Sequence, residues 1–316
     1  MPSTTLVTGA AGFAGSHLLD LLARDSTANA GAAAVVAWHR PGRARPDGPP
    51  HVRWQAVDVL DRQSVQTAIA EVRPSAVYHC AGAAHVGRAW DDTVATLDIN
   101  VRGTHNVLAG LERLDIESRL LIPSSALVYA AADRALTERD PLAPTTPYGL
   151  SKLAQELLAH HVAGPVRVTV ARAFNHVGPR QDPHFAASGF ARRIADIERG
   201  RWEPTISVGN LDARRDLTDV RDTVRAYRLI LERGEPSGVF NVCSGRAVAI
   251  RDVLDALIAR ARVPVSVKID PARYRPIDTP LLVGDPARAR ERFGWSPEIP
   301  LERTLEDLLE YWRHRE

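Results

Sequence analysis

The 316 residues of this chain suffice for about two domains or one large α/β unit, and their composition is ordinary for a globular protein, with 45% hydrophobic and 25% charged residues. A formal net charge of +2 is too small to indicate a nucleic-acid partner, and no run approaches the roughly 20 apolar residues that a membrane span needs. The first residues lack the charged and apolar segments of a signal peptide, so we expect a cytoplasmic protein.

Two cysteines, Cys80 and Cys243, lie in separate apolar segments, and neither has a partner at the spacing of a metal site or a redox motif. We therefore expect two buried free thiols and no metal site.

The first half of the chain alternates short β-branched or apolar runs with segments whose apolar residues recur at helical spacing. Helices are expected over 14–24 and 100–114. Strands are expected over 4–9, 33–39, 52–58, 76–82, 119–125 and 167–173. This βαβα order predicts an α/β protein of Rossmann type, with a doubly wound parallel sheet between two layers of helices.

The alternation ends after about residue 174, where loops, arginine-rich helices and short strands follow. Short strands are expected over 205–209, 238–245 and 265–270. An amphipathic helix is expected over 301–312. We expect residues 1–174 to form the sheet domain, joined by a segment that returns near 218–246. Residues 175–217 and 247–316 would then form a smaller C-terminal α/β region beside it.

The segment "TLVTGAAGFAG" places Gly9, Gly12 and Gly15 between the first predicted strand and the first predicted helix. Glycines at this spacing let backbone N–H groups and a helix N-terminus approach a pyrophosphate closely. A tight structural turn would have a similar sequence, but the position in the first βα unit favours a dinucleotide site.

The end of the second predicted strand indicates which dinucleotide binds. An acidic residue there would accept hydrogen bonds from the adenosine ribose, but this chain has His39 and Arg40, followed by Arg43 and Arg45. These cations favour the 2′-phosphate of NADP, although arginine is common throughout the chain. Asp58, at the end of the third predicted strand, is placed to reach the adenine amino group or to cap a helix.

Lysine occurs only at Lys152 and Lys268, so 40 − 2 = 38 of the basic residues are arginine. Lys152 follows Tyr148 by four residues, and Pro147 with the spacing of the leucines predicts a helix that places both on one face. An ammonium there would stabilise the phenolate and lower a phenol pKa that is ordinarily about 10. The lysine also has three donors for a cofactor ribose. We expect an acid–base tyrosine with a lysine beside it.

The predicted strand "RLLIPSS" ends with Ser124 and Ser125, ahead of the tyrosine in the sequence. A hydroxyl at this position could hold a substrate carbonyl oxygen beside the phenol. Serines at strand ends also cap helices, so both roles stay open at this point.

Together these features resemble the extended short-chain dehydrogenase/reductase family over nearly the whole chain. The segments "TGAAGFAG", "HCAGAA", "NVRGTHNVL" and "YGLSK" are similar to that family's two cofactor signatures, its central helix and its YxxxK motif. The resemblance implies that Ser125, Tyr148 and Lys152 are catalytic, with Asn100 as a helper on the central helix. The residues implied in NADP(H) binding are Gly9, Gly12, Phe13, Gly15, His39, Arg40, Asp58, Val59, Ala81, Gly82, Asn100, Tyr148 and Lys152.

Downstream, "ARAFNHVGPRQ", "RRDLTDVRD" and "RPIDTPLLVGD" resemble the nucleotide-sugar-modifying branch of that family. The resemblance implies that Asn175, Arg215 and Arg275 contact the diphosphate of a sugar nucleotide, a role that suits the forked guanidinium. The further candidates for substrate binding are Ser124, Ser125, His85 and Arg88. His85 and Arg88 could equally lie at the surface. The segments are most similar to the reductases of GDP-linked 6-deoxy-4-ketomannose and to the dehydratases related to them.

The two residues that follow Ser125 distinguish the reactions of this branch. Its dehydratases carry an acidic residue there to move the C5 proton and the C6 hydroxyl, whereas this chain has Ala126 and Leu127. We therefore expect NADPH-dependent reduction of the C4 ketone of an NDP-4-keto-6-deoxyhexose, with GDP as the favoured nucleotide. The alternatives are a 4-epimerase that retains its cofactor and, from another class, a non-catalytic dinucleotide sensor.

The family usually forms dimers through two helices of each subunit. The resemblance therefore implies a homodimer, with the segments 100–114 and 151–161 as candidates for the helix bundle between subunits. The other expected partner is the nucleotide-sugar substrate, with neither nucleic acid nor membrane.

Overall fold

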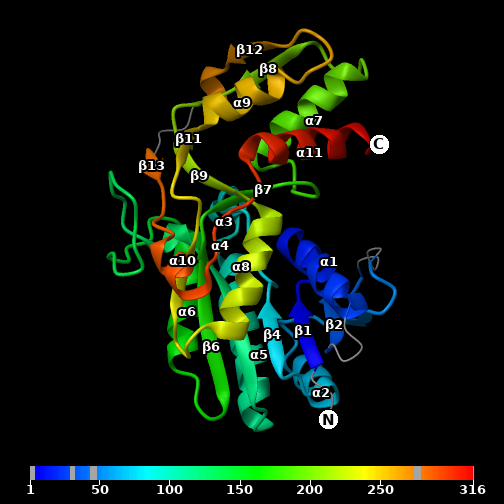
Figure 1. Cartoon of the computed structure of the whole chain (residues 1–316), viewed down its shortest axis with the longest axis vertical. Helices are drawn as coiled ribbons and strands as arrows, with labels where there is room; N and C mark the ends of the chain where they lie inside the picture. The colour runs from blue at the N-terminus through cyan, green and yellow to red at the C-terminus, as the bar shows by residue number, and fades with distance from the viewer. Residues whose placement is uncertain (1–3, 29–32, 43–47, 274–278, 316) are drawn as a thin grey trace.

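The computed structural model of the chain describes residues 4–28, 33–42, 48–273 and 279–315. A large sheet and its helices occupy one end of the long axis, and a smaller region occupies the other (Figure 1). The large sheet has seven strands in the order β10-β6-β5-β4-β1-β2-β3, all parallel. Its strands are β1 (Thr4–Thr8), β2 (Ala34–His39), β3 (Arg53–Ala56), β4 (Ala76–His79), β5 (Ser118–Ser125), β6 (Val166–Ala173) and β10 (Val239–Val242).

Helices cover both faces of the large sheet, because successive side chains of each strand point to opposite sides. Val7 packs in the core under one layer, and its neighbour Leu6 packs in the core under the other. The first layer consists of α1 (Phe13–Ala28), α8 (Val220–Arg233) and α10 (Ala287–Phe293). The second layer consists of α2 (Arg62–Val72), α5 (Gly103–Arg113) and α6 (Pro147–His160). The doubly wound parallel sheet expected from the sequence is therefore confirmed.

The smaller region contains two short sheets and a helical layer. The first sheet consists of β7 (Asn175–Val177), β9 (Arg214–Asp219), β11 (Ala247–Ala249) and β13 (Leu281–Leu282), and the second of β8 (Thr205–Val208) and β12 (Ser266–Ile269). Its helices are α7 (Ala186–Glu198), α9 (Ile250–Ile258) and α11 (Leu301–Arg313). These helices share one apolar core, which is separate from the two cores of the large sheet.

Two elements need a closer description than the sequence provides. The short strand expected over 238–245 is β10, which pairs with β6 at the edge of the large sheet. The helix expected over 100–114 is α5, preceded by one π-helical turn over Asp98–Arg102. A π turn adds one residue to a helical turn and often marks a functional position.

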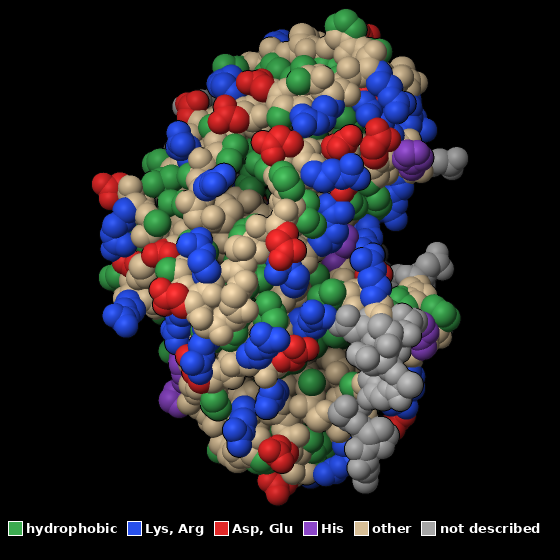
Figure 2. All heavy atoms as spheres, viewed as in Figure 1, with side chains coloured by type: hydrophobic (Ala, Val, Ile, Leu, Met, Phe, Trp, Pro, Cys, Tyr) green, Lys and Arg blue, Asp and Glu red, His purple; other side chains and the backbone are tan. Residues whose placement is uncertain are grey.

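Cations and anions are interspersed on the face shown in Figure 2, as the small net charge would lead one to expect. Within the described ranges, every helix is too short or too polar to span a lipid bilayer.

Candidate active site

Two cavities lie at the carboxyl ends of the large sheet. The strand order reverses between β1 and β4, which leaves a crevice where ligands commonly bind in such sheets. The larger cavity, of about 970 Å³, extends from the first helix turn to residues of the smaller region. The smaller cavity, of about 200 Å³, lies beside it at the ends of β2 and β3.

The glycine-rich turn forms one wall of these cavities. Gly9 has a φ of 61°, and a Cβ atom there would lie 2.5 Å from the backbone nitrogen of Ala81. Only glycine accommodates both the positive φ and this close approach. Gly12, Phe13 and Gly15 line the large cavity at the N-terminus of α1, where free N–H groups and the helix dipole favour an anion. This turn therefore has the geometry of a pyrophosphate cradle.

The small cavity brings together the residues that the sequence assigned to the adenosine end of the cofactor. The cavity is lined by Gly9, Trp38, His39, Arg40, Val57, Asp58, Val59, Leu60, Ala81, Gly82 and Ile99. Asp58 accepts a hydrogen bond from the backbone N–H of Leu60, and the helix cap of α2 is Asp61 instead. Arg43 and Arg45 lie outside the described residues. The end of β2 thus presents His39 and Arg40 to the cavity, without an acid.

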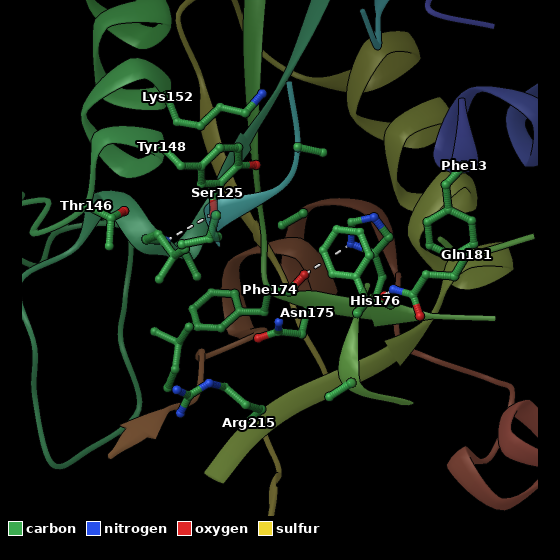
Figure 3. Close-up of a pocket in the computed structure, with 18 of the residues that line it drawn as sticks. Phe13, Ser125, Thr146, Tyr148, Lys152, Phe174, Asn175, His176, Gln181 and Arg215 are labelled. Atoms are coloured by element: carbon green, nitrogen blue, oxygen red, sulfur yellow. Dashed lines mark hydrogen bonds between the residues drawn. The ribbon is translucent and has the colours of Figure 1, made fainter. Parts of the chain in front are cut away.

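Tyr148 and Lys152 stand on the first two turns of α6. Thr146 caps this helix by accepting from the N–H of Gly149, and Pro147 occupies its first turn. Gly149 lets the helix start against the carbonyl oxygen of Leu127, which a Cβ atom would strike. Figure 3 shows Tyr148, Lys152 and Ser125 on the same side of the cavity. The helix start is therefore held against the end of β5, so that the phenol and the serine hydroxyl meet.

Ser125 caps a helical turn, which is one of the two roles that the sequence left open, and it also contacts the phenol. Its side chain accepts from the N–H of Leu127 at 3.1 Å and so caps the short helical turn over Ala126–Val128. The same side chain hydrogen-bonds Tyr148. At the end of β5, the Ser125 side chain therefore stabilises the local backbone and also contacts the phenol in the cavity.

Burial shapes the acid–base properties of the pair on α6. Burial raises the pKa of Tyr148 to about 12, and the hydrogen bond with Ser125 opposes the rise. Burial lowers the pKa of Lys152 to about 8, against the opposing effects of Cys80 and Glu156. The Lys152 ammonium donates to the carbonyl oxygen of Pro123 at 2.8 Å and lies 5.8 Å from the centroid of the Tyr148 ring. Burial thus raises the pKa of the phenol, where the sequence predicted a lowered one, and the hydrogen bond with Ser125 opposes the rise only in part.

Asn100 lies in the π-helical turn and is fully buried. Its amide oxygen accepts from the N–H of Ala83 at 2.7 Å, and its amide nitrogen donates to the Ala83 carbonyl and to Ser151. These bonds tie the loop after β4 to α6. A Cβ atom at Gly82 would lie 2.9 Å from the Asn100 oxygen, so the chain passes closely over this amide. Asn100 therefore supports the cavity wall from behind.

A buried polar network lies behind the two serines, and the sequence analysis did not identify it. Ser124 donates to Glu156 on α6, and Glu156 forms an ion pair with Arg172 of β6 at 2.7 Å. Arg172 also donates to the hydroxyl of Tyr129 at 3.0 Å, which in turn donates to Asn241 at 2.7 Å. The Ser124 hydroxyl, a candidate for substrate binding, thus belongs to this network. The position of Glu156, one turn after Lys152, is the one signal that could have revealed it.

The candidates for the diphosphate lie on the opposite wall. Asn175 of β7 and Arg215 of β9 both line the large cavity, and Figure 3 shows them below the phenol and the serine. Arg215 donates to the carbonyl oxygen of Thr279 at 2.9 Å, which orients its guanidinium along the wall. Burial lowers the pKa of this guanidinium. Arg275 lies outside the described residues.

The structure places His85 and Arg88 beside the cavity and not in its lining. His85 caps α3 (Val86–Asp91) by accepting from the N–H of Arg88. Its ring lies 5.4 Å from that of Phe185, which does line the cavity. Arg88 contacts His184 in the adjacent loop. These two residues therefore form part of the outer rim.

The two positions that distinguish dehydratases carry no acid. Ala126 and Leu127 line the large cavity, and no aspartate or glutamate is among the described residues that line it. The carboxylate of Glu156 is turned away into its ion pair. The described walls therefore supply no carboxylate that could take a C5 proton or protonate a leaving hydroxyl.

Known proteins resemble the chain over almost its full length. Residues 6–308 match the family model described as GDP-mannose 4,6 dehydratase. The chain is 36% identical to GDP-6-deoxy-D-mannose reductase of Pseudomonas aeruginosa, with 100% of this chain and 99% of that protein covered.

Solved structures extend the comparison. The structure of RMD from Pseudomonas aeruginosa complexed with NADPH has a TM-score of 0.83 and 33% identity, and 99% of this chain and 100% of that chain are covered. UDP-glucose 4-epimerase of Thermus thermophilus, in complex with NAD, has a TM-score of 0.85 and 28% identity over 99% and 100% of the two chains. Near-equal scores mean that the fold alone does not distinguish reduction from epimerisation. The match over residues 6–308 and the 36% identity over the whole chain nevertheless show that the chain belongs to the GDP-mannose 4,6-dehydratase family.

Proposed function

We propose that the protein reduces the C4 ketone of an NDP-4-keto-6-deoxyhexose with NADPH, and that the preferred nucleotide is GDP. The observation that carries this proposal is a cavity in which Ser125, Tyr148 and Lys152 meet while no acid is found among its described lining residues. The set supports proton donation to a carbonyl oxygen, and the described part of the lining offers no carboxylate of the kind that dehydration needs. The relative at 36% identity, named GDP-6-deoxy-D-mannose reductase, supports both the reaction and the nucleotide.

The residues of the two cavities fit NADP(H). The glycine-rich turn offers its N–H groups to the pyrophosphate, and Arg40, next to His39, offers positive charge to the 2′-phosphate. Lys152 has donors for the nicotinamide ribose. When bound, the reduced nicotinamide supplies the hydride that the C4 carbon accepts. A solved relative is complexed with NADPH, which agrees with this choice of cofactor.

In the proposed reaction, Tyr148 gives its phenolic proton to the oxygen that becomes the C4 hydroxyl. A pKa of about 12 keeps the phenol protonated at neutral pH, as a proton donor requires. Ser125 holds the same oxygen by a hydrogen bond and so keeps it within reach of the phenol. The Lys152 ammonium stabilises the phenolate that the proton transfer leaves.

The remaining wall would bind the sugar nucleotide. Asn175 and Arg215 face the cavity where the diphosphate would pass, and Arg275 would complete a cationic clamp. His85 and Arg88 would act from the rim. In this proposal, the cofactor binds mainly to residues 1–174 and to the segment near 218–246. The sugar nucleotide binds mainly to residues 175–217 and 247–316.

The experiment is to follow loss of NADPH absorbance with GDP-4-keto-6-deoxymannose, and in parallel with the UDP- and TDP-linked 4-keto sugars. Stoichiometric oxidation with the GDP sugar supports the proposal, and faster oxidation with another sugar changes the nucleotide. Conversion between two sugars by a tightly bound, unexchanged cofactor would instead indicate a 4-epimerase. Cofactor binding without turnover of any sugar would indicate a dinucleotide sensor.

We also propose that the protein is a homodimer. The exposed large apolar side chains include Trp90 of α3, Val94 of α4 (Thr93–Leu97), and Leu150 and Leu157 of α6, each at least half exposed. These three helices pack against one another, and we infer that their exposed apolar side chains form a surface that a second copy covers. The Leu157→Glu variant should sediment as a monomer. Trp202→Glu, at an exposed tryptophan outside this surface, should leave the dimer intact.

The cytoplasmic location stays a prediction.

A further inference from the structure

The segment over 178–181, between β7 and α7, is held against α1 of the large sheet. The Arg180 guanidinium donates to the Asp20 carboxylate at 2.5 Å and to Nδ1 of His17 at 2.8 Å. The Nε2 atom of His17 lies 2.8 Å from the carbonyl oxygen of Pro179. Three polar contacts therefore join the smaller region to the helix that starts at the glycine-rich turn.

These contacts use both nitrogens of the His17 ring. A guanidinium only donates and a carbonyl oxygen only accepts, so Nδ1 is the acceptor and Nε2 carries the proton. Burial and the neighbouring Arg180 lower the pKa of His17 to about 4, so the ring is uncharged at neutral pH, as this pattern requires. The ring also packs edge-on against Phe13, with centroids 5.7 Å apart. His17 therefore holds the segment by two hydrogen bonds of opposite direction.

The backbone of the segment has a conformation that arginine rarely adopts. Arg180 has a φ of 72°, in the left-handed region that favours glycine. A residue other than glycine persists in such a conformation where the surrounding contacts hold it there. His17 and Asp20 provide contacts of this kind through the guanidinium. The place of the segment against α1 is therefore set by these side chains, against the local preference of the backbone.

The same segment is anchored in the smaller region and reaches the large cavity. Gln181 lines this cavity, and its amide nitrogen donates to the carbonyl oxygen of His176 in β7 at 2.8 Å. The carbonyl oxygen of Gln181 accepts from Ser188 of α7 at 2.7 Å, and Ser188 accepts from the indole of Trp312 in α11 at 3.0 Å. Figure 3 shows Gln181 beside Phe13 and His176. The segment thus links α1, the cavity wall and the core of the smaller region.

We propose that His17 is a positioning residue for hydride transfer, because it holds the segment 178–181 against α1 and so fixes the smaller region relative to the cofactor. The inference rests on the proposed function, in which the nicotinamide binds beside the first turn of α1 and the sugar nucleotide binds along Asn175 and Arg215. His17 does not line the large cavity, so it acts through the segment. Reacting atoms must approach to about 3–3.5 Å, and an error of about 1 Å can lower a rate about a hundredfold.

The test is a single turnover. A stoichiometric complex of the protein with NADPH is mixed with saturating GDP-4-keto-6-deoxymannose, or with the UDP- or TDP-linked sugar if that is reduced faster. The rate constant of NADPH oxidation reports hydride transfer, which deuterated NADPH verifies by an isotope effect, and the amplitude reports the fraction of active protein. His17→Phe keeps an aromatic ring against Phe13 and removes both hydrogen bonds. Its rate constant should fall by about ten- to a hundredfold, with the amplitude and the dissociation constant of NADPH unchanged.

Arg180→Asn tests the same link from the other side, because asparagine tolerates a positive φ and only the guanidinium is lost. The rate constant should fall by a similar factor, and the double variant should lose less than the product of the two single effects. Arg199→Met is the matched control. Arg199 donates to the carbonyl oxygens of Trp312 and Arg313 within the smaller region and lies outside both cavity linings. This variant should keep the wild-type rate constant.

A wild-type rate constant in His17→Phe and Arg180→Asn would overturn the inference. A fall in amplitude alone would also overturn it, since that indicates a structural role, and so would weaker NADPH binding with an unchanged rate constant. An equal loss in Arg199→Met would have the same meaning. Should His17→Phe not fold, Arg180→Asn decides alone. Absence of NADPH oxidation by the wild-type protein with all three sugars would contradict the proposed reductase itself, and the inference with it.

Discussion

The two sides of the large cavity are built in different ways. Ser125 ends β5, and Tyr148 with Lys152 starts α6, so the three groups that we propose to react come from two regular elements in direct contact. The opposite side takes Asn175 from β7, Arg215 from β9 and further residues from separate loops. A long strand and a helix in direct contact hold side chains to a precise geometry, whereas a wall built from short strands and loops tolerates more change. The comparison suggests that the reaction is set by the large sheet and that the choice of sugar nucleotide is set by the smaller region.

The largest expected effect concerns the reacting side. Tyr148→Phe removes the proton donor and should lower kcat by about 10²- to 10⁴-fold, while the dissociation constant of NADPH stays unchanged. Tyr311→Phe, which lies on α11 outside the cavity lining, should keep full activity. Steady-state rates and NADPH titration check both variants. Full turnover by Tyr148→Phe would show that the reacting groups are elsewhere.

The buried ion pair between Glu156 and Arg172, behind the reacting side, should contribute to the stability of the fold. Glu156→Gln leaves Arg172 buried without its counter-charge and should cost about 3–5 kcal/mol of unfolding free energy in urea denaturation. Glu156→Met combined with Arg172→Met should recover much of that loss, because it removes both charges together. Arg53→Ala breaks an exposed ion pair with Glu71 and should cost far less. Equal losses in the buried and the exposed variants would contradict the role given to the network.

The small cavity, which Arg40 lines, should discriminate between NADPH and NADH. Arg40→Ala should lower kcat/KM for NADPH by about ten- to a hundredfold, because one charge-assisted hydrogen bond is lost, and should leave kcat/KM for NADH unchanged. Arg167→Ala is the control, since this exposed arginine lies on β6 outside both cavities. A parallel loss with both cofactors would mean that Arg40 does not meet the 2′-phosphate.

The smallest effect is the response to pH. The folded-state pKa of Lys152, lowered to about 8, means that the ammonium is present below this pH and is lost as the pH rises through it. We expect kcat/KM for NADPH to fall above pH 8 and to approach a decline of about tenfold per pH unit. Lys152→Arg keeps a cation and should abolish this decline at a lower overall rate. Lys268→Arg, at the other lysine, should retain it. A decline that persists in Lys152→Arg would assign it to another group.

The reacting side could be predicted from the sequence because its signals are local. Pro147 at a helix start and the spacing of Tyr148 and Lys152 predict the face that α6 presents. The glycine-rich turn after β1 is equally local, and the structure gives Gly9 the positive φ that such a turn requires. The order of strands and helices predicts the sheet for the same reason.

The features of the fold and the site that the sequence did not predict depend on contacts between residues far apart in the chain. Glu156 and Arg172 lie 16 positions apart and meet only because α6 packs across β5 and β6. The position of Glu156 one turn after Lys152 is a local signal of a buried carboxylate, but it does not identify Arg172 or the Ser124 hydroxyl as its partners. The shift in the pKa of Tyr148 follows from burial, which a sequence does not display. The sequence predicts that a segment near 218–246 returns to the sheet domain, but the partner strand of β10, which is β6, follows only from the fold.

The central claim is hydride transfer from NADPH to C4 of the sugar, and isotope transfer tests it most directly. The protein is incubated with stereospecifically deuterated NADPH and GDP-4-keto-6-deoxymannose, and the product is examined by NMR. Our account predicts deuterium at C4 in one configuration, with one NADP released for each sugar reduced. A product without deuterium at C4, formed without net consumption of NADPH, would contradict it.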